Sequence, residues 1–282
     1  MVLDSSTVEK SKSTLKHASN RYEANRDRVI GDISEVSGER SASAWQRFLE
    51  SEDQDVPLFL IQEAVIEWLQ QKMGVEEITK AFEEFQTLMG RAFADEVIYN
   101  QRASYFLDYL VFERPTHCGQ QQTRVSPFKG FVSDWISTHT HQLSPKKHEM
   151  LCSLDGYQHA LFRVARSSRK RVIFENICSR QHLCRPLDPA TENPSMFHKN
   201  LIYQGFIYPS PHGIKLSQGM FTHDRSVTRI ILKSVKKKLK SEQDSFSQSM
   251  LPTLATLHLR HSRQRYISSA KVYRQALLEN ES

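Results

Sequence analysis

The chain has 282 residues, of which 39% are hydrophobic and 10% are aromatic. This composition is too apolar for a disordered chain, and the length is sufficient for one large domain or two smaller ones with a buried core. No apolar stretch reaches the roughly 20 residues of a membrane-spanning helix, and the first residues lack the apolar region of a secretory signal. Four cysteines in a chain of this length do not make a disulfide framework. These features predict a soluble, cytoplasmic protein.

Charge is distributed unevenly along the chain. The net charge is +6, but residues 1–100 carry −8 and residues 101–282 carry +14. The most acidic part, residues 29–100, carries −10. This asymmetry predicts a basic functional face in the second part of the chain, an acidic partner for that face in the first part, or both.

The first part of the chain is expected to be helical after a polar extension. Residues 1–40 are polar and rich in serine, which predicts a flexible or marginally helical extension. An apolar residue recurs there at every seventh position, so a docking helix is the alternative. Residues 41–154 show helical periodicity and predict a helical domain, in which Gly74, Gly90 and Pro115 end helices and Ser144 begins one. The expected helices cover residues 42–50, 56–74, 75–90, 92–114, 128–143 and 144–154.

The periodicity then changes to that of strands. Residues 159–177, "HALFRVARSSRKRVIFENI", predict two strands about a Ser-Ser turn, and residues 201–221 predict two more about "PSPHG". We therefore expect a small antiparallel β module of four or more strands at residues 155–223, as a twisted sheet or a partial barrel. Residues 224–282 predict basic C-terminal helices packed on the rest, the second of them beginning at Pro252. The predicted fold class is α+β.

Three segments carry a family resemblance. "FLDYLVFERP" (residues 106–115) is similar to the F-L-D-W-F-L-F-D-R-P segment of an uncharacterised group of bacterial cytoplasmic proteins. "ALFRVARSSRKRVIFENI" occupies the place of that group's first β-module strands, and "LIYQGFIYPSPHGIKLSQG" resembles its later hairpin. A "D-L-L-T-G-E" turn of the group is replaced here by "NICSRQHLC", and the Cys-rich zinc motif of some relatives has no counterpart. The resemblance implies helices followed by a small β module, and it implies no activity.

Known catalytic and metal-binding motifs are absent from the sequence. There is no G-x-G-x-x-G, Walker loop, G-x-S-x-G or H-E-x-x-H, so we expect no enzyme of these classes, no catalytic residues and no cofactor. His139 and His141 stand two positions apart and diverge on a helix. Cys178 and Cys184, with His182 between them, lack the short ligand pairing that is usual for zinc. No metal site is expected.

Basic residues gather in three places. Val227, Ile231, Val235 and Leu239 predict the apolar face of a helix, and the basic residues beside them recur along another face without an intervening acid. Those basic residues are Arg225, Arg229, Lys233, Lys236, Lys237 and Lys240. A second cluster is expected at the tip of the first hairpin and comprises Arg163, Arg166, Arg169, Lys170 and Arg171. A third comprises Arg260, Arg263 and Arg265 with His258 and His261 on the last helix.

These clusters predict a non-enzymatic cytoplasmic binding or adaptor protein with a basic C-terminal surface. The alternative is a nucleic-acid-binding protein without sequence preference, because cations that track a phosphate backbone read no bases. Aromatic residues Tyr203, Phe206 and Tyr208 suit base stacking, but core filling is the simpler interpretation. The basic helix would also suit an anionic membrane surface, although its apolar face has no aromatic anchor. It would equally suit docking on the acidic helical region, in the same molecule or in a partner.

Overall fold

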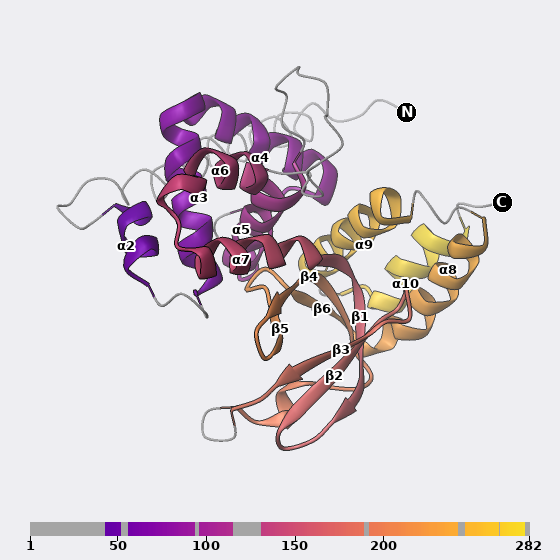
Figure 1. The fold of residues 1–282 in the computed structure, drawn as a ribbon. Helices are drawn as coiled ribbons and strands as arrows, with labels where there is room; N and C mark the ends of the chain where they lie inside the picture. Colours follow the sequence, from indigo (N-terminus) through magenta and orange to yellow (C-terminus); the bar gives the residue numbers. More distant parts are fainter. Residues whose placement is uncertain are drawn as a thin grey trace, which may run out of the picture.

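A computed structural model describes residues 43–51, 56–93, 96–114, 131–188, 192–241, 246–264 and 266–279. The chain forms a group of helices, then an antiparallel sheet, then a second group of helices (Figure 1). The predicted α+β class is confirmed. The extension predicted at residues 1–40 lies outside the described residues.

The N-terminal helices follow the apolar periodicity of the sequence. Ile61, Val65 and Leu69 line the buried face of α3, and Gly74 ends that helix at φ 80°, a backbone conformation that glycine adopts without strain. Ser144 caps α7 by accepting a hydrogen bond from the backbone N–H of Lys147, as predicted. The elements of this part are α2 (Ala44–Glu50), α3 (Leu58–Met73), α4 (Val75–Met89), α5 (Tyr99–Asp108), η1 (Tyr109–Glu113), α6 (Phe131–His139), η2 (Thr140–Gln142), α7 (Pro145–Ser153) and η3 (Leu154–Gly156).

The helix predicted at residues 92–114 differs from expectation at its start. Helix α5 begins at Tyr99, and before it Phe93 donates its backbone N–H to the Glu96 carboxylate at 3.0 Å. After Asp108 the helix continues as the wider π-helix η1. Such π-helical segments are uncommon and often lie at functional positions.

The sheet has the strand order β3-β2-β1-β4-β5, with β6 paired to β4. Both predicted hairpins are present, but β3 and β6 were not foreseen. Strand β3 lies within a segment that has no strand periodicity, and only one of its five residues, Leu183, is buried. The strands are β1 (Gln158–Ser167), β2 (Arg171–Asn176), β3 (His182–Pro186), β4 (Ile202–Ser210), β5 (Gly213–Leu216) and β6 (Phe221–His223), with the short helix η4 (Pro194–Met196) before β4.

The sheet curls until its outer strands meet. A Cβ atom at Gly213 of β5 would overlap the backbone carbonyl of Cys184 in β3, so glycine permits this approach. The interior of the curl is filled by apolar residues from β1, β2 and β4, among them Phe162, Phe174 and Ile207. The β module is therefore a partial barrel with its own small core.

The C-terminal helices cover one part of the outer face of the sheet. Helix α9 begins at Phe246, so the prediction that it starts at Pro252 is wrong. Pro252 is buried inside the helix, where it removes one backbone hydrogen bond without ending the helix. The expected single last helix is divided after Arg263. These elements are η5 (Arg225–Val227), α8 (Thr228–Ser241), α9 (Phe246–Arg263), α10 (Ser269–Arg274) and η6 (Gln275–Glu279).

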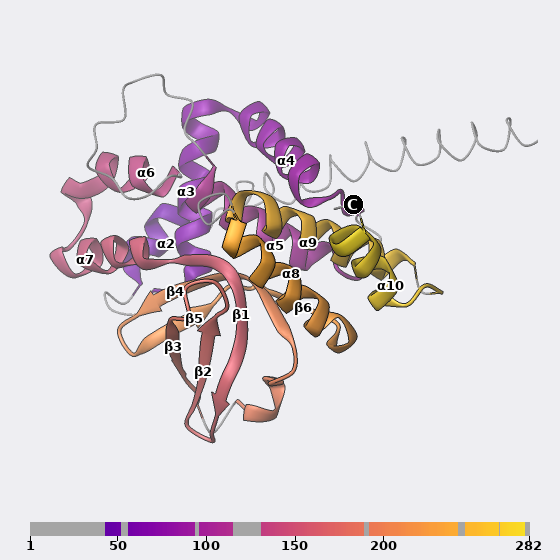
Figure 2. The same ribbon diagram turned by 90° about the vertical axis from the view of Figure 1, so that its right-hand side faces the viewer.

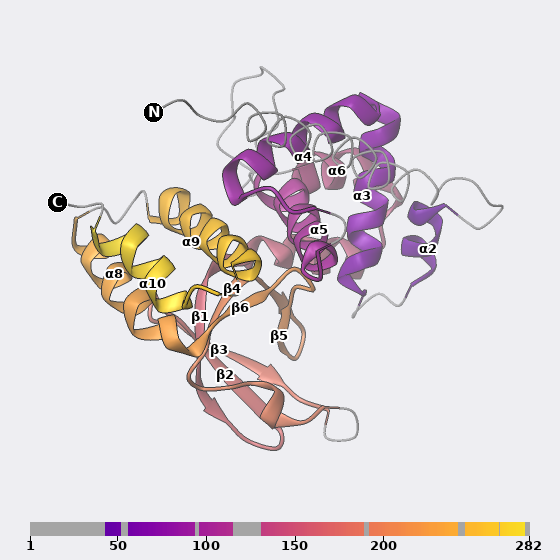
Figure 3. The same ribbon diagram turned by 180° about the vertical axis from the view of Figure 1, so that it is seen from behind.

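Strand β4 joins the two helical groups. Its residue Ile202 packs in a core with α8, α9 and α10, whereas Phe206 and Tyr208 pack in a second core with the N-terminal helices. In Figures 2 and 3 the two groups cover neighbouring parts of the sheet, and the far end of the β1–β2 hairpin projects away from both. None of the helices in the described part of the chain is both long and apolar enough to cross a membrane.

The turn before β6 approaches α5 closely at Gly219. A Cβ atom there would lie 2.5 Å from the backbone N and Cα of Tyr105. We expect Gly219→Ala to lower the free energy of unfolding by about 3 kcal/mol, because backbone atoms on both sides must move apart. Gly74→Ala is the control: it meets no atom within 4 Å and should cost about 1 kcal/mol through its positive φ alone. Chemical denaturation of both variants measures the difference, and an equal or smaller loss for Gly219→Ala would contradict the expectation.

Candidate functional site

The predicted basic helix exposes its cations and buries its apolar residues. Val227, Ile231 and Val235 are buried in the core that α8 shares with the sheet, α9 and α10. On the solvent side lies a cationic stripe, which we define as Arg225, Arg229, Lys233, Lys236 and Lys237, all exposed. The side chain of the sixth predicted residue, Lys240, lies outside the described part of the structure. Val227, Ile231 and Val235 are therefore covered and do not face a membrane surface.

Four cations of the stripe do not pair with the acidic helices in the described part of the chain. Arg225, Arg229, Lys233 and Lys236 are exposed, and none of the four forms an ion pair with a described carboxylate. Helix α8 packs instead on α9, α10 and η6. The four cations therefore face solvent in the described structure.

The cluster at the first hairpin is only partly as predicted. Arg166, Arg169, Lys170 and Arg171 are exposed around the turn between β1 and β2. Arg163 does not lie at this tip, because it occupies the middle of β1 opposite Glu175. The turn projects away from both helical groups whereas α8 packs beside the sheet (Figures 1 and 2), so these cations and the stripe form separate surfaces.

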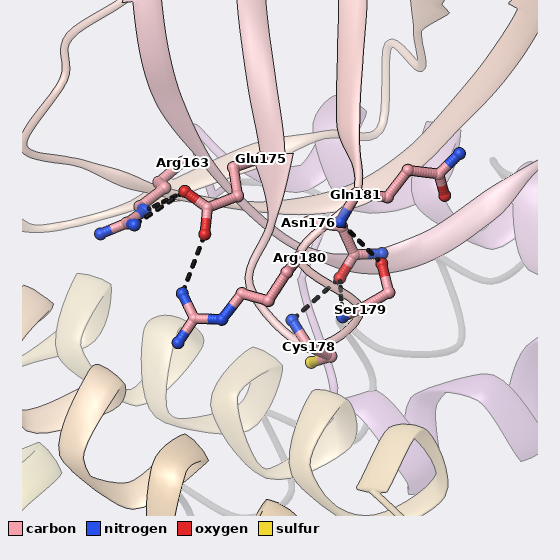
Figure 4. A network of polar contacts seen from close by, with 7 residues as sticks. All are labelled: Arg163, Glu175, Asn176, Cys178, Ser179, Arg180 and Gln181. Carbon is pink, nitrogen blue, oxygen red and sulfur yellow. Dashed lines mark hydrogen bonds and ion pairs between the residues drawn. The ribbon is translucent and has the colours of Figure 1, made fainter.

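Arg163 belongs to a polar network that supports the β2–β3 turn (Figure 4). The buried Glu175 carboxylate accepts from Arg163 Nη2 at 2.7 Å and from Arg180 Nη1 at 2.8 Å. Burial tends to raise the pKa of Glu175, but the hydrogen bonds from the two arginines outweigh it and hold the pKa below its usual value. Within the turn, Asn176 Oδ1 accepts from the backbone N–H groups of Cys178 and Ser179. Arg163 is thus engaged in holding the sheet.

The third basic cluster, at the end of α9, connects the two helical groups. Arg263 at the end of α9 donates to the Glu96 carboxylate, with Nε 2.5 Å from Oε1, and its guanidinium lies 4.9 Å from the ring centre of Phe93. Arg263 also donates to the backbone carbonyl of Arg91. The charge asymmetry predicted an acidic partner for the basic residues within the same molecule. In the structure, the basic residue that contacts the acidic region in this way is Arg263 of α9. Arg265 lies outside the described residues.

No group of three or more His, Cys, Asp or Glu side chains in the described part of the chain could hold a metal ion. His139 lies with Nδ1 2.9 Å from the Trp135 carbonyl oxygen. Tyr203, Phe206 and Tyr208 are buried, so they fill cores and offer no ring for base stacking.

A buried carboxyl group that the sequence analysis did not single out joins three parts of the molecule. Asp108 accepts hydrogen bonds from Gln62 Nε2 of α3 at 2.7 Å, from the Tyr208 hydroxyl of β4 at 2.5 Å and from the Ser217 hydroxyl after β5. Burial raises the pKa of Asp108 to about 7, although these hydrogen bonds oppose the shift. Strongly shifted carboxyl groups in pockets are candidates for functional sites.

A second set of polar contacts runs through the interior. The Tyr105 hydroxyl lies 2.5 Å from His159 Nε2, and His159 Nδ1 lies 2.8 Å from the Glu113 carboxylate. Gln204 Nε2 reaches the same hydroxyl at 3.4 Å and donates to the Leu251 carbonyl at 2.8 Å. The buried polar groups thus run from η1 through β1 and α5 to β4 and α9.

Further ionisable residues of the interior, Arg102, His223 and His258, lie towards the C-terminal helices. Arg102 donates to the Ala255 carbonyl at 2.6 Å and stacks over Phe221 at 4.4 Å. Burial lowers the pKa of Arg102 to about 10 and, aided by the charge of Arg102, lowers that of His258 to about 3. Burial also lowers the pKa of His223, whose Nε2 lies 3.0 Å from Gln204 Oε1. Both histidines are neutral in the folded protein.

The signal for these residues was present in the sequence but was not used. Asp108 stands in the aromatic run "YFLDYLVF" and Gln204 in "LIYQGFIY", where each replaces an apolar residue at a core position. A polar residue in such a run is buried with a partner more often than it is buried alone. The identity of the partners was out of reach, since they lie elsewhere in the chain.

Searches against protein-family models, curated proteins and solved structures each returned no match. The family resemblance, which covers roughly residues 60–222, therefore stays a prediction.

The free energy of unfolding should depend on pH through buried groups whose contributions have opposite signs. The unfolded chain binds protons at His223 and His258 below about pH 6.5 whereas the folded protein does not, so these histidines cost stability as the pH falls. Asp108 acts oppositely, because between about pH 7 and 4 the folded protein holds its proton and the unfolded chain does not. Each group contributes a slope of roughly 1.4 kcal/mol per pH unit. We expect His258→Gln to reduce the loss of unfolding free energy between pH 7 and pH 5 and Asp108→Asn to increase it, as measured by urea denaturation. Parallel pH profiles for all three proteins would contradict this.

The hydrogen bond from Tyr208 to Asp108 should matter most when the carboxyl is ionised. Tyr208→Phe removes a donor to a buried charge, so we expect a loss of about 2–3 kcal/mol at pH 8 and a smaller loss at pH 5. Tyr157→Phe is the matched control, since its hydroxyl donates to the neutral Phe112 carbonyl at 3.2 Å. It should cost about 1 kcal/mol at both pH values. A pH-independent effect of Tyr208→Phe in the same denaturation series would show that Asp108 does not titrate in this range.

Proposed function

We propose that the chain is a non-enzymatic binding or adaptor protein that docks a polyanionic partner, an acidic protein surface, on the cationic stripe. The observation that carries this proposal is the exposure of Arg225, Arg229, Lys233 and Lys236 on one side of a helix whose other side is buried. Ordinary solvated helix faces mix charges of both signs. This one presents a single sign to solvent from a rigid support.

Ion pairs elsewhere in the molecule support an external partner for the stripe. The acidic helices already have basic partners of their own: Glu96 pairs with Arg263, and Glu77 and Glu84 pair with the buried Arg114 at 2.6 and 3.0 Å. Exposed unpaired cations give little folding stability. Their suitable role is electrostatic steering and docking of a negatively charged surface.

Sequence-tolerant binding of nucleic acid is the second candidate. It is favoured by the separate exposed cations Arg166, Arg169, Lys170 and Arg171 at the β1–β2 turn. From Arg225 to Lys236 the stripe extends over roughly 16 Å at a helical rise of about 1.5 Å per residue, enough to follow several phosphates of one strand. No feature of these cations selects bases, so both DNA and RNA would bind.

A cytoplasmic location is part of the proposal. Cys152, Cys178 and Cys184 are free thiols, and two of them are exposed, which suits a reducing compartment.

Binding to two polyanions tests both candidates. Poly-L-glutamate represents an acidic protein surface, and labelled 20-nucleotide single- and double-stranded DNA and RNA represent the phosphate backbone. We expect binding at 50 mM salt that weakens steeply at 200 mM. Replacing Arg225, Arg229, Lys233 and Lys236 by glutamine should abolish it while changing the free energy of unfolding by less than about 0.5 kcal/mol per position.

A charge-matched variant is the control. Glutamine at Lys72, Lys80, Lys146 and Lys199, which are exposed outside the stripe, removes the same charge and should leave most of the binding intact. Binding of poly-L-glutamate alone supports the adaptor, and tight salt-sensitive binding of the oligonucleotides supports the second candidate. Absence of both at 50 mM salt, or equal losses in the two variants, would show that the stripe is not a docking surface.

A further inference from the structure

The outer face of the β1–β2 hairpin is covered at one end and open at the other. At the covered end, Leu161 and Ile177 pack in the core that the sheet shares with α8, α9 and α10. Towards the turn, Arg166 and Arg171 are exposed. This far end of the hairpin projects away from both helical groups (Figures 2 and 3), so the surface around it is accessible to a large partner.

A β-bulge turns Arg166 to this outer face. Val164 pairs with Phe174 and is buried inside the partial barrel, so strict alternation would direct Arg166 to the interior as well. The register shifts by one residue after Val164, and Arg166 pairs with Ile173 instead. Because Ile173 is next to the inward-facing Phe174, it faces outward, and so does its partner. Bulges commonly re-aim a side chain in this way.

Two more arginines extend the outer face to the turn. Arg171 stands two residues before Ile173 on β2, so it also faces outward. It lies diagonally across from Arg166, at about 7–8 Å between such positions of an antiparallel pair. Arg169 is exposed in the turn itself. The open end of the hairpin therefore presents three guanidinium groups close together.

Towards the covered end, two further arginines flank a buried acid (Figure 4). Glu175 accepts from Arg163 at 2.7 Å and from Arg180 at 2.8 Å. The two arginine side chains are 40% and 63% exposed, whereas that of Glu175 is 8% exposed. Two cations against one carboxylate leave a positive surplus on the solvent side. Glu175 is the only acid among the residues of β1, β2 and β3.

We define the arginine face as Arg163, Arg166, Arg169, Arg171 and Arg180. At a rise of about 3.3 Å per strand residue, it extends roughly 16 Å from Arg163 to the turn. Lys170 is left out, because its carbonyl accepts from the backbone N–H of Leu187 at 2.9 Å and the exposed Asp188 follows directly.

The composition of this face indicates the chemistry of its partner. All five cations are arginines, whose planar guanidinium donates two parallel hydrogen bonds to a phosphate group. Single-stranded nucleic acids are usually bound with the additional help of aromatic rings that stack on bases. The two phenylalanines of these strands, Phe162 and Phe174, are buried inside the barrel. The face thus offers phosphate contacts without base stacking, which suits a duplex.

We propose that the arginine face binds the phosphate backbone of double-stranded nucleic acid. The guanidinium groups donate to phosphate oxygens along the hairpin, and no base is read. This inference rests on the second candidate function, nucleic-acid binding, and assigns to it a surface apart from the cationic stripe. It does not depend on docking of an acidic protein at the stripe.

The experiment measures binding of the full chain to a labelled 20-base-pair DNA duplex by fluorescence anisotropy between 50 and 200 mM salt. The test variant combines Arg166→Gln, Arg169→Gln and Arg171→Gln and leaves the ion pairs of Glu175 intact. We expect it to weaken binding at 50 mM salt at least tenfold. The slope of log K against log salt should become shallower by about 2–3, because each lost phosphate contact removes about 0.9.

Two comparisons separate phosphate recognition from general effects of charge and folding. Lys72→Gln, Lys80→Gln and Lys146→Gln together remove the same charge from exposed positions on the N-terminal helices and should leave the slope unchanged. Lysine at Arg166, Arg169 and Arg171 keeps the charge and should keep the slope, with binding weaker by about threefold because the bidentate fork is lost. A lysine variant that binds as weakly as the glutamine variant would contradict the proposal.

The remaining outcomes distinguish this inference from the functions on which it builds. If the duplex binds and the glutamine variant matches the control, the inference is wrong and nucleic-acid binding stands. Tighter binding of single-stranded DNA than of the duplex would also overturn it. So would an equal loss of poly-L-glutamate and duplex in the glutamine variant, because the face would then recognise acidic proteins. Absence of duplex binding at 50 mM salt would remove the second candidate function together with this inference.

Discussion

The side chain of Gln204 lies where three parts of the molecule meet. It is fully buried on β4, donates to the Leu251 carbonyl of α9 and the Tyr105 hydroxyl of α5, and faces His223 of β6 with its oxygen. A buried amide costs several kcal/mol if its groups stay unpaired. The partners of Gln204 are therefore held in fixed positions. Because two of these partners belong to α5 and α9, both helical groups are held in place on the one strand β4.

Several charged residues inside the molecule are paired, whereas cations of α8 are exposed on its surface. Inside, Arg114 and Glu175 have partners. At the surface the exposed Arg263 pairs with Glu96, so the acidic excess of the N-terminal helices is partly compensated where the two groups meet. Outside, α8 keeps cations without described carboxylate partners. These interior charges are paired, whereas Arg225, Arg229, Lys233 and Lys236 form no ion pair with a described carboxylate. This contrast separates a surface available for binding from charges that serve the fold. Only Asp108 is a fully buried acid with no positive neighbour bonded to it in the described structure.

Much of the architecture was readable from the sequence, because it follows from local rules. The apolar spacing of Ile61, Val65 and Leu69 and the stop at Gly74 gave α3, and alternation gave β1, β2, β4 and β5. Strand β3 escaped because it is a short edge strand with one buried residue. The position of Arg163, the joint at Arg263 and the network of Asp108 could not be derived, since each depends on partners that periodicity does not specify.

The polar contacts that close the structure connect distant parts of the chain. Tyr208 and Asp108 stand 100 residues apart in sequence, and Arg102 and Ala255 stand 153 apart. Folding must close such large loops before these bonds contribute any stability, and a high contact order slows the search for the native state. The molecule should consequently fold slowly. The N-terminal helices should form early, and their packing should be completed only after β4 has been synthesised and has docked on them.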